Sequence, residues 1–382
     1  MANRHHAYRL LQCLAVSIRP LRVEELAEIL ALDFDNAKDG VPQLKEDWRW
    51  KDRKEAVLST CSSLITVVGG GSQRVVQFSH FSVKEFLTSD RLAASSPEVS
   101  HFHILPEPAH TVIAKSCLGI LLQSDDGVGD VEEKRSSLAK YAAEHWVDHA
   151  RFEKVSTHLE DGMRHLCDPA KPYFEAWLDL YDVDNGWYEF TGHSYQRRGS
   201  PLYYASFCGF HNLVAHLVTE HPEHVNATLG RCLTPLVAAL HKRHFNIAEL
   251  LRQRGADVNV TGYRNRTPLH AALLDGSVDI AQWLLTHGAD AMSRQDDYDT
   301  PLHLAVRNGQ FELVRMLLRR RIVIDAKNND DHTSLHLASE AGQVEIVQLL
   351  LRSRADTAAR DRRKRTPLHL ALSWVSGVLC DS

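Results

Sequence analysis

Five threonines stand 33 residues apart in the second half of this chain, and no other feature restricts the possible folds as strongly. Thr234, Thr267, Thr300, Thr333 and Thr366 each open a segment of the form TPLxxA or TSLHLA, and Ser200 opens a similar one 34 residues earlier. A fixed period of this length is typical of a solenoid, in which each unit buries its apolar face against its neighbours. The spacing predicts six stacked units from about residue 199 to the end.

Each unit carries the signals for two helices joined by a tight turn. The threonine can cap a short helix, and the proline after it occupies the first turn, where no amide hydrogen bond is lost. A turn glycine follows, and then a second segment, such as ELVRMLL or EIVQLLL, with apolar residues at helical spacing. Units close on RGADV or HGADA, where Gly255 and Gly288 are predicted to take the left-handed conformation.

These units resemble the ankyrin repeat in length, in the TPLH tetrad, in the GAD turn and in phasing, over nearly half of the chain. The resemblance implies two antiparallel helices and a projecting hairpin loop per repeat, stacked into a curved array. It also implies that the tetrad histidines bond to the loops of their own and adjoining units. We therefore expect His270, His303, His336 and His369 to be structural rather than metal ligands.

Several units depart from the pattern. Arg321 and Arg354 replace the closing glycine, where a left-handed side chain costs on the order of 1 kcal/mol, so these turns should be looser or built differently. In the second unit Val237 replaces the tetrad histidine and Arg243 the turn glycine. The sixth unit ends before a full second helix, which indicates either a truncated chain or a short capping unit, and fraying is expected there.

The hairpin tips and nearby first-helix positions are the predicted contact surface for a protein partner. The charges of successive tips are basic, acidic, acidic and basic, and they would determine the orientation and the association rate of a partner more than its affinity. The alternative is that the charged tips are solvated loops that only keep the protein soluble. The candidate residues are Tyr263, Arg264, Arg266, Leu274, Asp275, Asp296, Asp297, Tyr298, Asp299, Arg307, Asn308, Asp330, Asp331, His332, Glu340, Arg362, Arg363 and Arg365, with Lys364 between the last two.

The first part of the chain predicts a winged-helix-like plan. A helix is expected from near Val23, with Leu26, Ile29 and Leu30 on one side, followed by the amphipathic segment KEAVLSTCSSLITVV, a GGGSQ turn, the strand RVVQFSH and the helix FSVKEFLTSDRLA. The predicted fold is mainly α, with a winged-helix-like domain and its small β-hairpin over residues 1–95, a helical connector over 96–198 and an ankyrin solenoid over 199–382.

A second resemblance concerns the segments RPLRVEELAEILALDFD, VLSTCSSLI and VVQFSHFSVKEFLTS. They look like the winged helix that follows the NACHT nucleotide-binding domain in fungal receptor-like proteins ending in ankyrin repeats. The stretches from HILPEPAH to YFEAWLDLYD resemble the helical connector of these proteins. The resemblance implies a segment that packs on an NTPase and transmits its state to or from the repeats.

Signals for catalysis or cofactor binding are weak. The chain has no G-x-x-x-x-G-K-[ST] motif, and GGGSQR lacks the lysine and hydroxyl that hold a triphosphate and magnesium. His145 and His149 are four apart in EHWVDH, but Trp146 stands where a zinc peptidase needs glutamate. We predict no enzymatic activity, no cofactor and no metal, and regard the chain as the C-terminal half of the NACHT–ankyrin architecture.

Composition limits the classes of partner and the cellular compartment that fit this chain. A net charge of -5 does not favour nucleic acid or an anionic membrane, no apolar run reaches the length of a membrane span, and seven scattered cysteines fit free thiols in the cytoplasm. The predicted function is a non-enzymatic protein-interaction module, with a possible NTPase or signalling partner. The alternative is a winged-helix DNA-binding regulator that senses its partner through the repeats, although the segment STCSSLITVV offers no basic recognition face.

Overall fold

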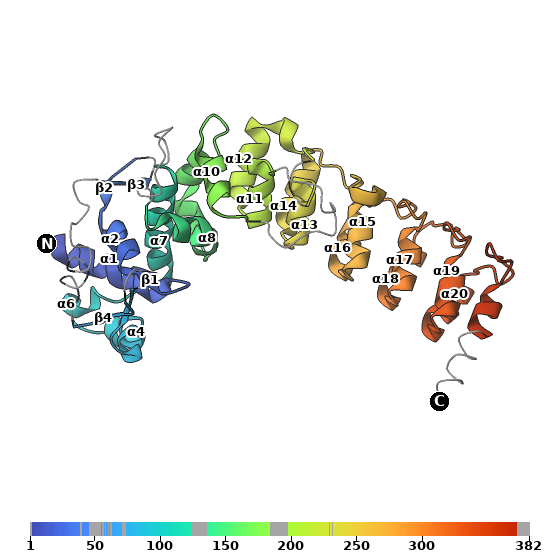
Figure 1. Ribbon diagram of the computed structural model, residues 1–382, viewed down its shortest axis with the longest axis horizontal. Coiled ribbons are helices and arrows are strands. Elements are labelled where there is room, and N and C mark those ends of the chain that lie inside the picture. The colour runs from blue at the N-terminus through green and yellow to red at the C-terminus, as the bar shows by residue number, and fades with distance from the viewer. Residues whose placement is uncertain are drawn as a thin grey trace. The chain divides into compact units, whose positions relative to one another are not determined.

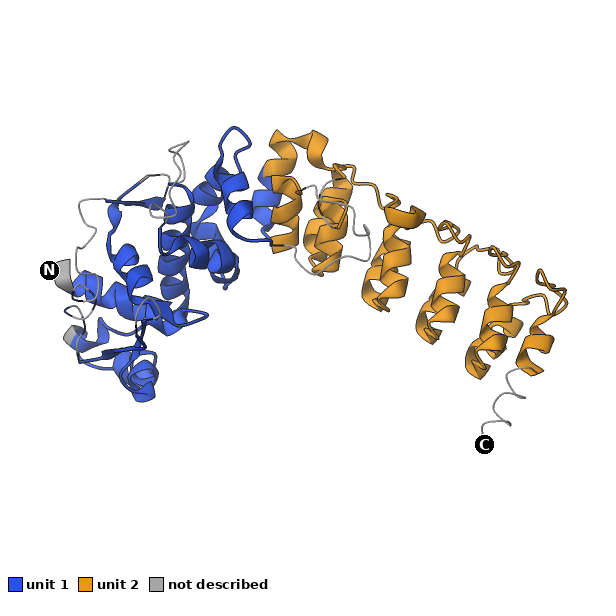
Figure 2. Cartoon of the chain, viewed as in Figure 1, with its two compact units in different colours: residues 1–185, 210–216 blue, residues 186–209, 217–382 orange. Residues whose placement is uncertain are grey.

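The computed structural model describes residues 2–38, 40–45, 55, 57, 59, 61, 63–70, 74–123, 136–183, 198–228, 230 and 232–372. The chain divides into two compact units, coloured separately in Figure 2. The first contains Met1–Asn185 and Phe210–His216, and the second contains Gly186–Gly209 and Leu217–Ser382. No helix among the described residues combines the length and apolar character that crossing a membrane requires.

The first unit begins with the predicted winged-helix plan. It contains helices α1 (Ala2–Val16) and α2 (Val23–Leu30) and a three-stranded antiparallel sheet in the order β1-β5-β4. Strand β1 (Leu21–Arg22) lies between the two helices in the chain, and β4 (Ile65–Val68) and β5 (Val75–Phe78) follow later. Residues 55, 57, 59 and 61 are helical, and the rest of the expected helix before β4 lies outside the described residues, as does most of the GGGSQ turn. Short helices α4 (Phe81–Leu87), α5 (Asp90–Ala93) and α6 (Pro97–Ser100) follow.

Helix α2 shows why this segment folds as predicted. Its start is fixed by Glu25, whose carboxylate accepts a 2.7 Å hydrogen bond from the Arg22 amide and pairs with the Arg19 guanidinium at 2.7 Å. The expected apolar side is buried, with Leu26 and Ile29 fully covered and Leu30 nearly so. Burial of this stripe, rather than helix propensity, stabilises such a short helix.

A second hairpin, formed by β2 (Leu32–Lys38) and β3 (Val41–Leu44), was not predicted. Gly40 lies at its turn with φ +72°. The sequence DG before β3 is a strong signal for a short hairpin, but the other aspartates of this segment argue against strands. The hairpin packs on helix α7 (Pro106–Leu121) at Gly119, where a Cβ atom would overlap the Pro42 carbonyl oxygen.

The connector is helical, as the sequence predicts. Helices α7, α8 (Ala139–Ala150), α9 (Glu160–Leu166) and α10 (Tyr173–Leu180) surround an aromatic core, with a 3₁₀ turn η4 at Val155–His158. Trp146 and Trp177 meet edge to face at 5.3 Å, and the Trp177 indole donates a 3.0 Å hydrogen bond to the Ala143 carbonyl. Phe210 belongs to the same unit, because its ring stacks on Trp146 at 5.4 Å.

The second unit contains the predicted helix pairs, which follow one another in a row with their hairpin loops along one edge (Figure 1). The described pairs are α11 (Pro201–Cys208) with α12 (His211–Glu220), α13 (Pro235–His241) with α14 (Phe245–Gln253), α15 (Pro268–Leu274) with α16 (Val278–Thr286), α17 (Pro301–Arg307) with α18 (Phe311–Leu318), and α19 (Ser334–Glu340) with α20 (Val344–Arg352). Helix α12 spans the boundary between the two units. Short 3₁₀ turns lie at η5 (Pro222–His224) and η6 (Tyr263–Asn265).

Each first helix starts as the repeat pattern predicts. Thr267, Thr300 and Thr333 are the N-cap residues, and each forms a capping box with the histidine three positions on. The leucine two positions after the N-cap is buried at Leu202, Leu236, Leu269, Leu302 and Leu335, whereas its counterpart in the sixth unit, Leu368, is exposed. The sixth unit is described only to residue 372, so the predicted lack of a full second helix concerns residues outside the described part of the chain.

The arginines that replace glycine behave in two ways. Arg243 and Arg354 adopt the left-handed conformation themselves, with φ of +61° and +68°. Arg321 does not, and its turn is built differently, with the Ile322 amide bonded to the Arg320 carbonyl at 3.0 Å. In an earlier unit the Asn259 side chain donates a hydrogen bond to the carbonyl of the closing residue Gly288. Met292 occupies the position equivalent to Asn259 before the closing residue Arg321, and its sulfur atom accepts from the Val323 amide instead.

Candidate partner-binding surface

The shape of the last two described hairpin tips is fixed by one side chain in each. The Asn328 Oδ1 atom accepts hydrogen bonds of 3.0 Å from the amides of Asp330 and His332. Asp361 repeats the arrangement, accepting from the amides of Arg363 at 2.9 Å and Arg365 at 2.7 Å. Asparagine and aspartate commonly hold turns in this way. Burial would raise the pKa of Asp361, but hydrogen bonds and the charge of Arg365 outweigh it and lower the pKa to about 2.

A non-glycine residue takes the left-handed conformation at the same place in each tip. These residues are Asn265, Tyr298, Asp331 and Lys364, with φ of 59°, 60°, 58° and 60°. Such a conformation costs an ordinary side chain on the order of 1 kcal/mol relative to glycine. The strain is unusual for a bulky residue and is often found at functional sites.

Successive tips are joined into a continuous edge. Backbone hydrogen bonds run from the amide of Asp296 to the Arg264 carbonyl at 3.1 Å, from Asn329 to Asp297 at 3.2 Å and from Arg362 to Asp330 at 3.2 Å. Two side chains add a second row, because Arg294 donates to the Lys327 carbonyl at 2.9 Å and Lys327 donates to the Arg360 carbonyl at 2.7 Å. The tips are therefore presented in fixed register rather than as independent loops.

Some of the predicted charge bands neutralise one another within the array. Arg264 pairs with Asp297 of the next tip at 3.4 Å. Asp299 is fully buried, where its carboxylate accepts from Asn328 Nδ2 at 3.0 Å and from Arg307 at 2.6 Å. Asp299 is therefore bonded within the stack and leaves no carboxylate exposed at the surface.

Other tip charges stay exposed and make no ion pair within the described residues. They comprise the acidic Asp296 and Asp330, and the basic Arg362, Arg363 and Lys364. The half-buried His332 lies 3.4 Å from Asp361, and Arg365 also pairs with Asp361, at 2.8 Å. The exposed edge is consequently acidic in its middle tips and basic in its last described tip.

Two tip tyrosines add apolar surface to this edge. The side chains of Tyr263 and Tyr298 are 52% and 55% exposed. The Arg294 guanidinium lies 5.7 Å from the centre of the Tyr298 ring, which holds the ring by a cation–π contact. Large aromatic residues at the surface supply much of the energy of protein interfaces.

The first-helix candidates form a separate group. They lie at the C-terminal ends of α15, α17 and α19, which is the end away from the tips, and comprise Leu274, Asp275, Arg307, Asn308 and Glu340. A helix of seven residues separates the two groups by about 10 Å. Arg307 reaches back to the tip side, through its pair with Asp299. Arg266, at the base of the first tip, is half-buried.

Two of the tetrad histidines, His303 and His336, bond to the loop of the next unit as the resemblance predicts. Nδ1 of His303 accepts from the Thr300 amide at 3.2 Å, so Nε2 carries the proton and donates to the His332 carbonyl of the next unit at 3.0 Å. His336 does the same with the Arg365 carbonyl at 3.2 Å. Burial lowers the pKa of both, and lowers that of His270 to about 4.

Two histidine clusters outside the tips could suggest metal binding. Burial lowers the pKa of His149 to about 3, and its ring nitrogens lie 2.8 Å from His110 Nδ1 and 2.9 Å from the Tyr141 hydroxyl, so these groups satisfy one another. His221, Glu223 and His224 bring ligand atoms within 4.8 Å of one another on the turn η5. The sequence analysis did not single out this group, although its H-x-E-H spacing was visible.

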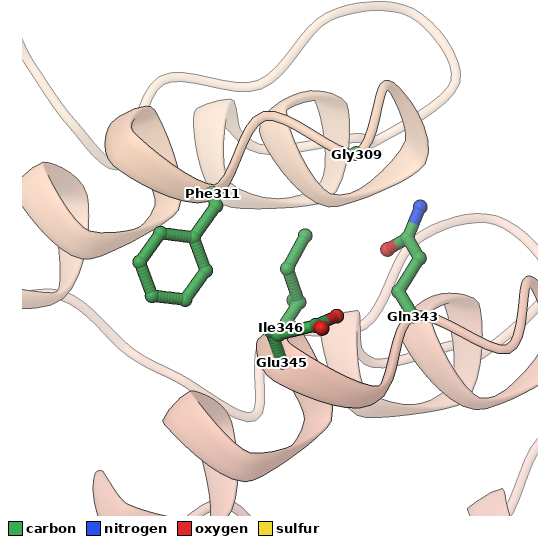
Figure 3. A pocket seen from close by; sticks show the side chains of 5 residues that line it. All are labelled: Gly309, Phe311, Gln343, Glu345 and Ile346. Carbon is green, nitrogen blue, oxygen red and sulfur yellow. The ribbon is translucent and has the colours of Figure 1, made fainter.

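A small pocket lies between the last two described helix pairs, at the end of the repeats away from the tips (Figure 3). Its volume is about 250 Å³, and it is lined by Gly309, Phe311, Gln343, Glu345 and Ile346. The side chains of Phe311 and Ile346 form its apolar part, and those of Gln343 and Glu345 its polar part (Figure 3). The sequence analysis did not predict it.

Comparisons with known proteins agree with the architecture. Residues 202–295, 260–328 and 320–378 match the ankyrin repeat family, and residues 1–97 match the winged helix domain of GPI inositol-deacylase. The chain thus carries ankyrin repeats and an N-terminal winged-helix domain of this type, which confirms the predicted fold class. Ankyrin repeats support a role as a protein-interaction module.

A fungal relative shares much of the sequence. The azaphilone pigments biosynthesis cluster protein L of Monascus ruber is 30% identical over 257 residues, which is 63% of this chain and 53% of that protein. The chain therefore spans about half the length of the relative.

Proposed function

We propose that the hairpin tips of the ankyrin repeats bind a protein partner, and that the N-terminal half docks this recognition onto a signalling component of the NACHT type. The proposal divides the chain into a winged helix over residues 1–95, a connector over 96–198 and an array over 199–382. It treats the molecule as a binding module rather than an enzyme and places it in the cytoplasm.

Tyr298 is the observation that carries the proposal. Its backbone is left-handed at φ +60°, where glycine would be more stable by on the order of 1 kcal/mol, yet its ring is more than half exposed and buries little surface in return. A strained, exposed aromatic side chain on a rigid edge contributes little to folding. It is well suited to contribute contact area to a partner.

The exposed charges add orientation to this contact. Asp296 and Asp330 lie on the middle tips and Arg362 to Lys364 on the last described tip, so a complementary partner would carry basic groups followed by acidic ones. Such complementarity speeds encounter and fixes orientation, and it weakens with added salt.

Support for docking by the N-terminal half comes from helix α4. Phe81 and Phe86 are 70% and 51% exposed, and of the helix residues only Leu87 is buried. Two large aromatic side chains exposed on one short helix provide apolar area that another protein surface can cover. In our proposal this surface belongs to the signalling component.

A photocrosslinking experiment tests the tip proposal. A benzophenone residue at position 298 should crosslink to a protein partner in extracts of the native host, whereas the same residue at the exposed position Gln282 on α16 should not. The affinity of the captured protein is then measured for Asp296→Lys/Asp330→Lys and for the control Glu220→Lys/Glu312→Lys, which changes the net charge equally on second helices. The tip variant should bind about tenfold more weakly than the control. Equal crosslinking at both positions, or equal affinities, would contradict the proposal.

A further inference from the structure

We infer that the pocket between the α17–α18 and α19–α20 pairs receives an arginine or lysine side chain of a protein partner. The inference rests on the proposed function as a protein-interaction module and concerns a surface distinct from the tips. Three observations support it: a carboxylate without an internal partner, a buried acceptor without a donor, and an apolar wall beside them.

The carboxylate belongs to a row that repeats along the second helices. Asp279, Glu312 and Glu345 occupy the same position in three successive units. Asp279 forms an ion pair with Arg243, and Glu312 forms one with Arg315. In the last described pair Gln348 stands where Arg315 stands one unit earlier, so Glu345 lacks the arginine that pairs with Glu312.

Glu345 makes no ion pair among the described residues and is exposed. Because its two counterparts each carry a bound guanidinium, the same place in this unit suits a cation supplied from outside. Arginine and lysine are the natural donors, and guanidinium matches a carboxylate in a two-pronged geometry.

The second polar group is Gln343. Its amide oxygen is buried and accepts no hydrogen bond from the described residues. Gln310 stands at the same position one unit earlier; its amide nitrogen donates to the Leu273 carbonyl at 2.7 Å, and its own amide oxygen likewise accepts no hydrogen bond from the described residues. In Figure 3 the Gln343 nitrogen points away from Phe311 and its oxygen toward the pocket residues. Buried acceptors without donors are rare and costly, so a donor entering here would relieve a penalty.

The apolar wall fits the stem of such a side chain. Ile346 is buried, and Phe311 is 38% exposed with its ring at the side of the pocket (Figure 3). Arginine and lysine pack their methylene groups on apolar surface and place the cation at a polar rim, and an aromatic face also attracts the charge. The volume of about 250 Å³ is below the roughly 300–1,000 Å³ usual for small-molecule sites, which favours one side chain over a metabolite.

A titration of the intact chain, labelled at isoleucine methyl groups, tests the inference. The probes are acetyl-Ala-Arg-Ala-amide and the same peptide with citrulline, which keeps the shape and removes the charge. The arginine peptide should shift the Ile346 methyl signal with a dissociation constant on the order of 1 mM. The citrulline peptide should bind about tenfold more weakly.

Variants of the two acidic positions provide the matched comparison. Glu345→Gln should weaken the arginine peptide about tenfold, whereas Glu312→Gln, in the same row but already paired, should leave binding unchanged. Equal binding of both peptides, or equal effects of the two variants, would overturn the inference. Because the probe reports at Ile346, neither result depends on the tip crosslinking experiment, and the two proposals can fail separately.

Discussion

The contribution of the histidine contact between successive repeats to the free energy of unfolding can be measured by replacing His303 and His369 separately with alanine. His303 is fully buried, and its ring bonds to the Thr300 amide and to the His332 carbonyl of the next unit. His369 keeps the local contact, with the Thr366 amide 3.3 Å from Nδ1, but it is exposed and bonds to no further unit among the described residues. The two histidines therefore differ mainly in burial and in one hydrogen bond between units.

The expected magnitudes follow from these contacts. His303→Ala leaves the buried Thr300 amide without its partner and removes one of the two hydrogen bonds to the His332 carbonyl, which keeps the one from the Asn328 amide. At about 1 kcal/mol for each lost bond, and a similar cost for the cavity, the expected loss is about 3 kcal/mol. His369→Ala should cost less than about 1 kcal/mol because water replaces its contacts. Equilibrium urea unfolding, followed by far-ultraviolet circular dichroism, gives both values. Equal losses, or a loss below 1 kcal/mol for His303→Ala, would refute the role assigned to the histidine between units.

Three further predictions concern backbone and protonation. Gly119→Ala should lower the free energy of unfolding by at least about 1 kcal/mol in urea titrations, because overlap with the Pro42 carbonyl outweighs the gain in helix propensity. In the same titrations Arg354→Gly should stabilise the chain by about 0.5 kcal/mol, since its φ is +68°, whereas Arg321→Gly should destabilise it by a similar amount. The pKa of His270 is lowered to about 4 from 6.5, so the unfolded chain binds its proton first; thermal melts should show stability falling as pH drops from 6.5 to 4, and falling less in His270→Asn.

The repeat architecture could be predicted because each unit carries several agreeing signals. Threonine, proline and histidine at fixed places specify one helix start, and the structure uses them as capping boxes at Thr267, Thr300 and Thr333. The N-terminal helix that begins at Val23 could also be predicted, because Leu26, Ile29 and Leu30 recur at helical spacing. Local capping and periodicity in these segments agree with the final packing.

The tip surface was only partly predictable. The charged residues of the tips are visible in the sequence, but which of them form ion pairs depends on how neighbouring tips approach one another. The burial of Asp299 and the ion pair between Arg264 and Asp297 could therefore not be predicted. The hairpin β2–β3 was missed because aspartates in its first strand have low β-propensity. The Glu345 pocket was missed because it arises between units, where Gln348 replaces an arginine.

Hydrogen exchange of the intact chain, with and without the partner captured at position 298, tests the tip surface most directly. The account predicts slower exchange for peptides that cover residues 296–299, 329–332 and 362–365, with little change in α16. Slower exchange confined to residues 1–97, or to the second helices with unchanged tips, would contradict it.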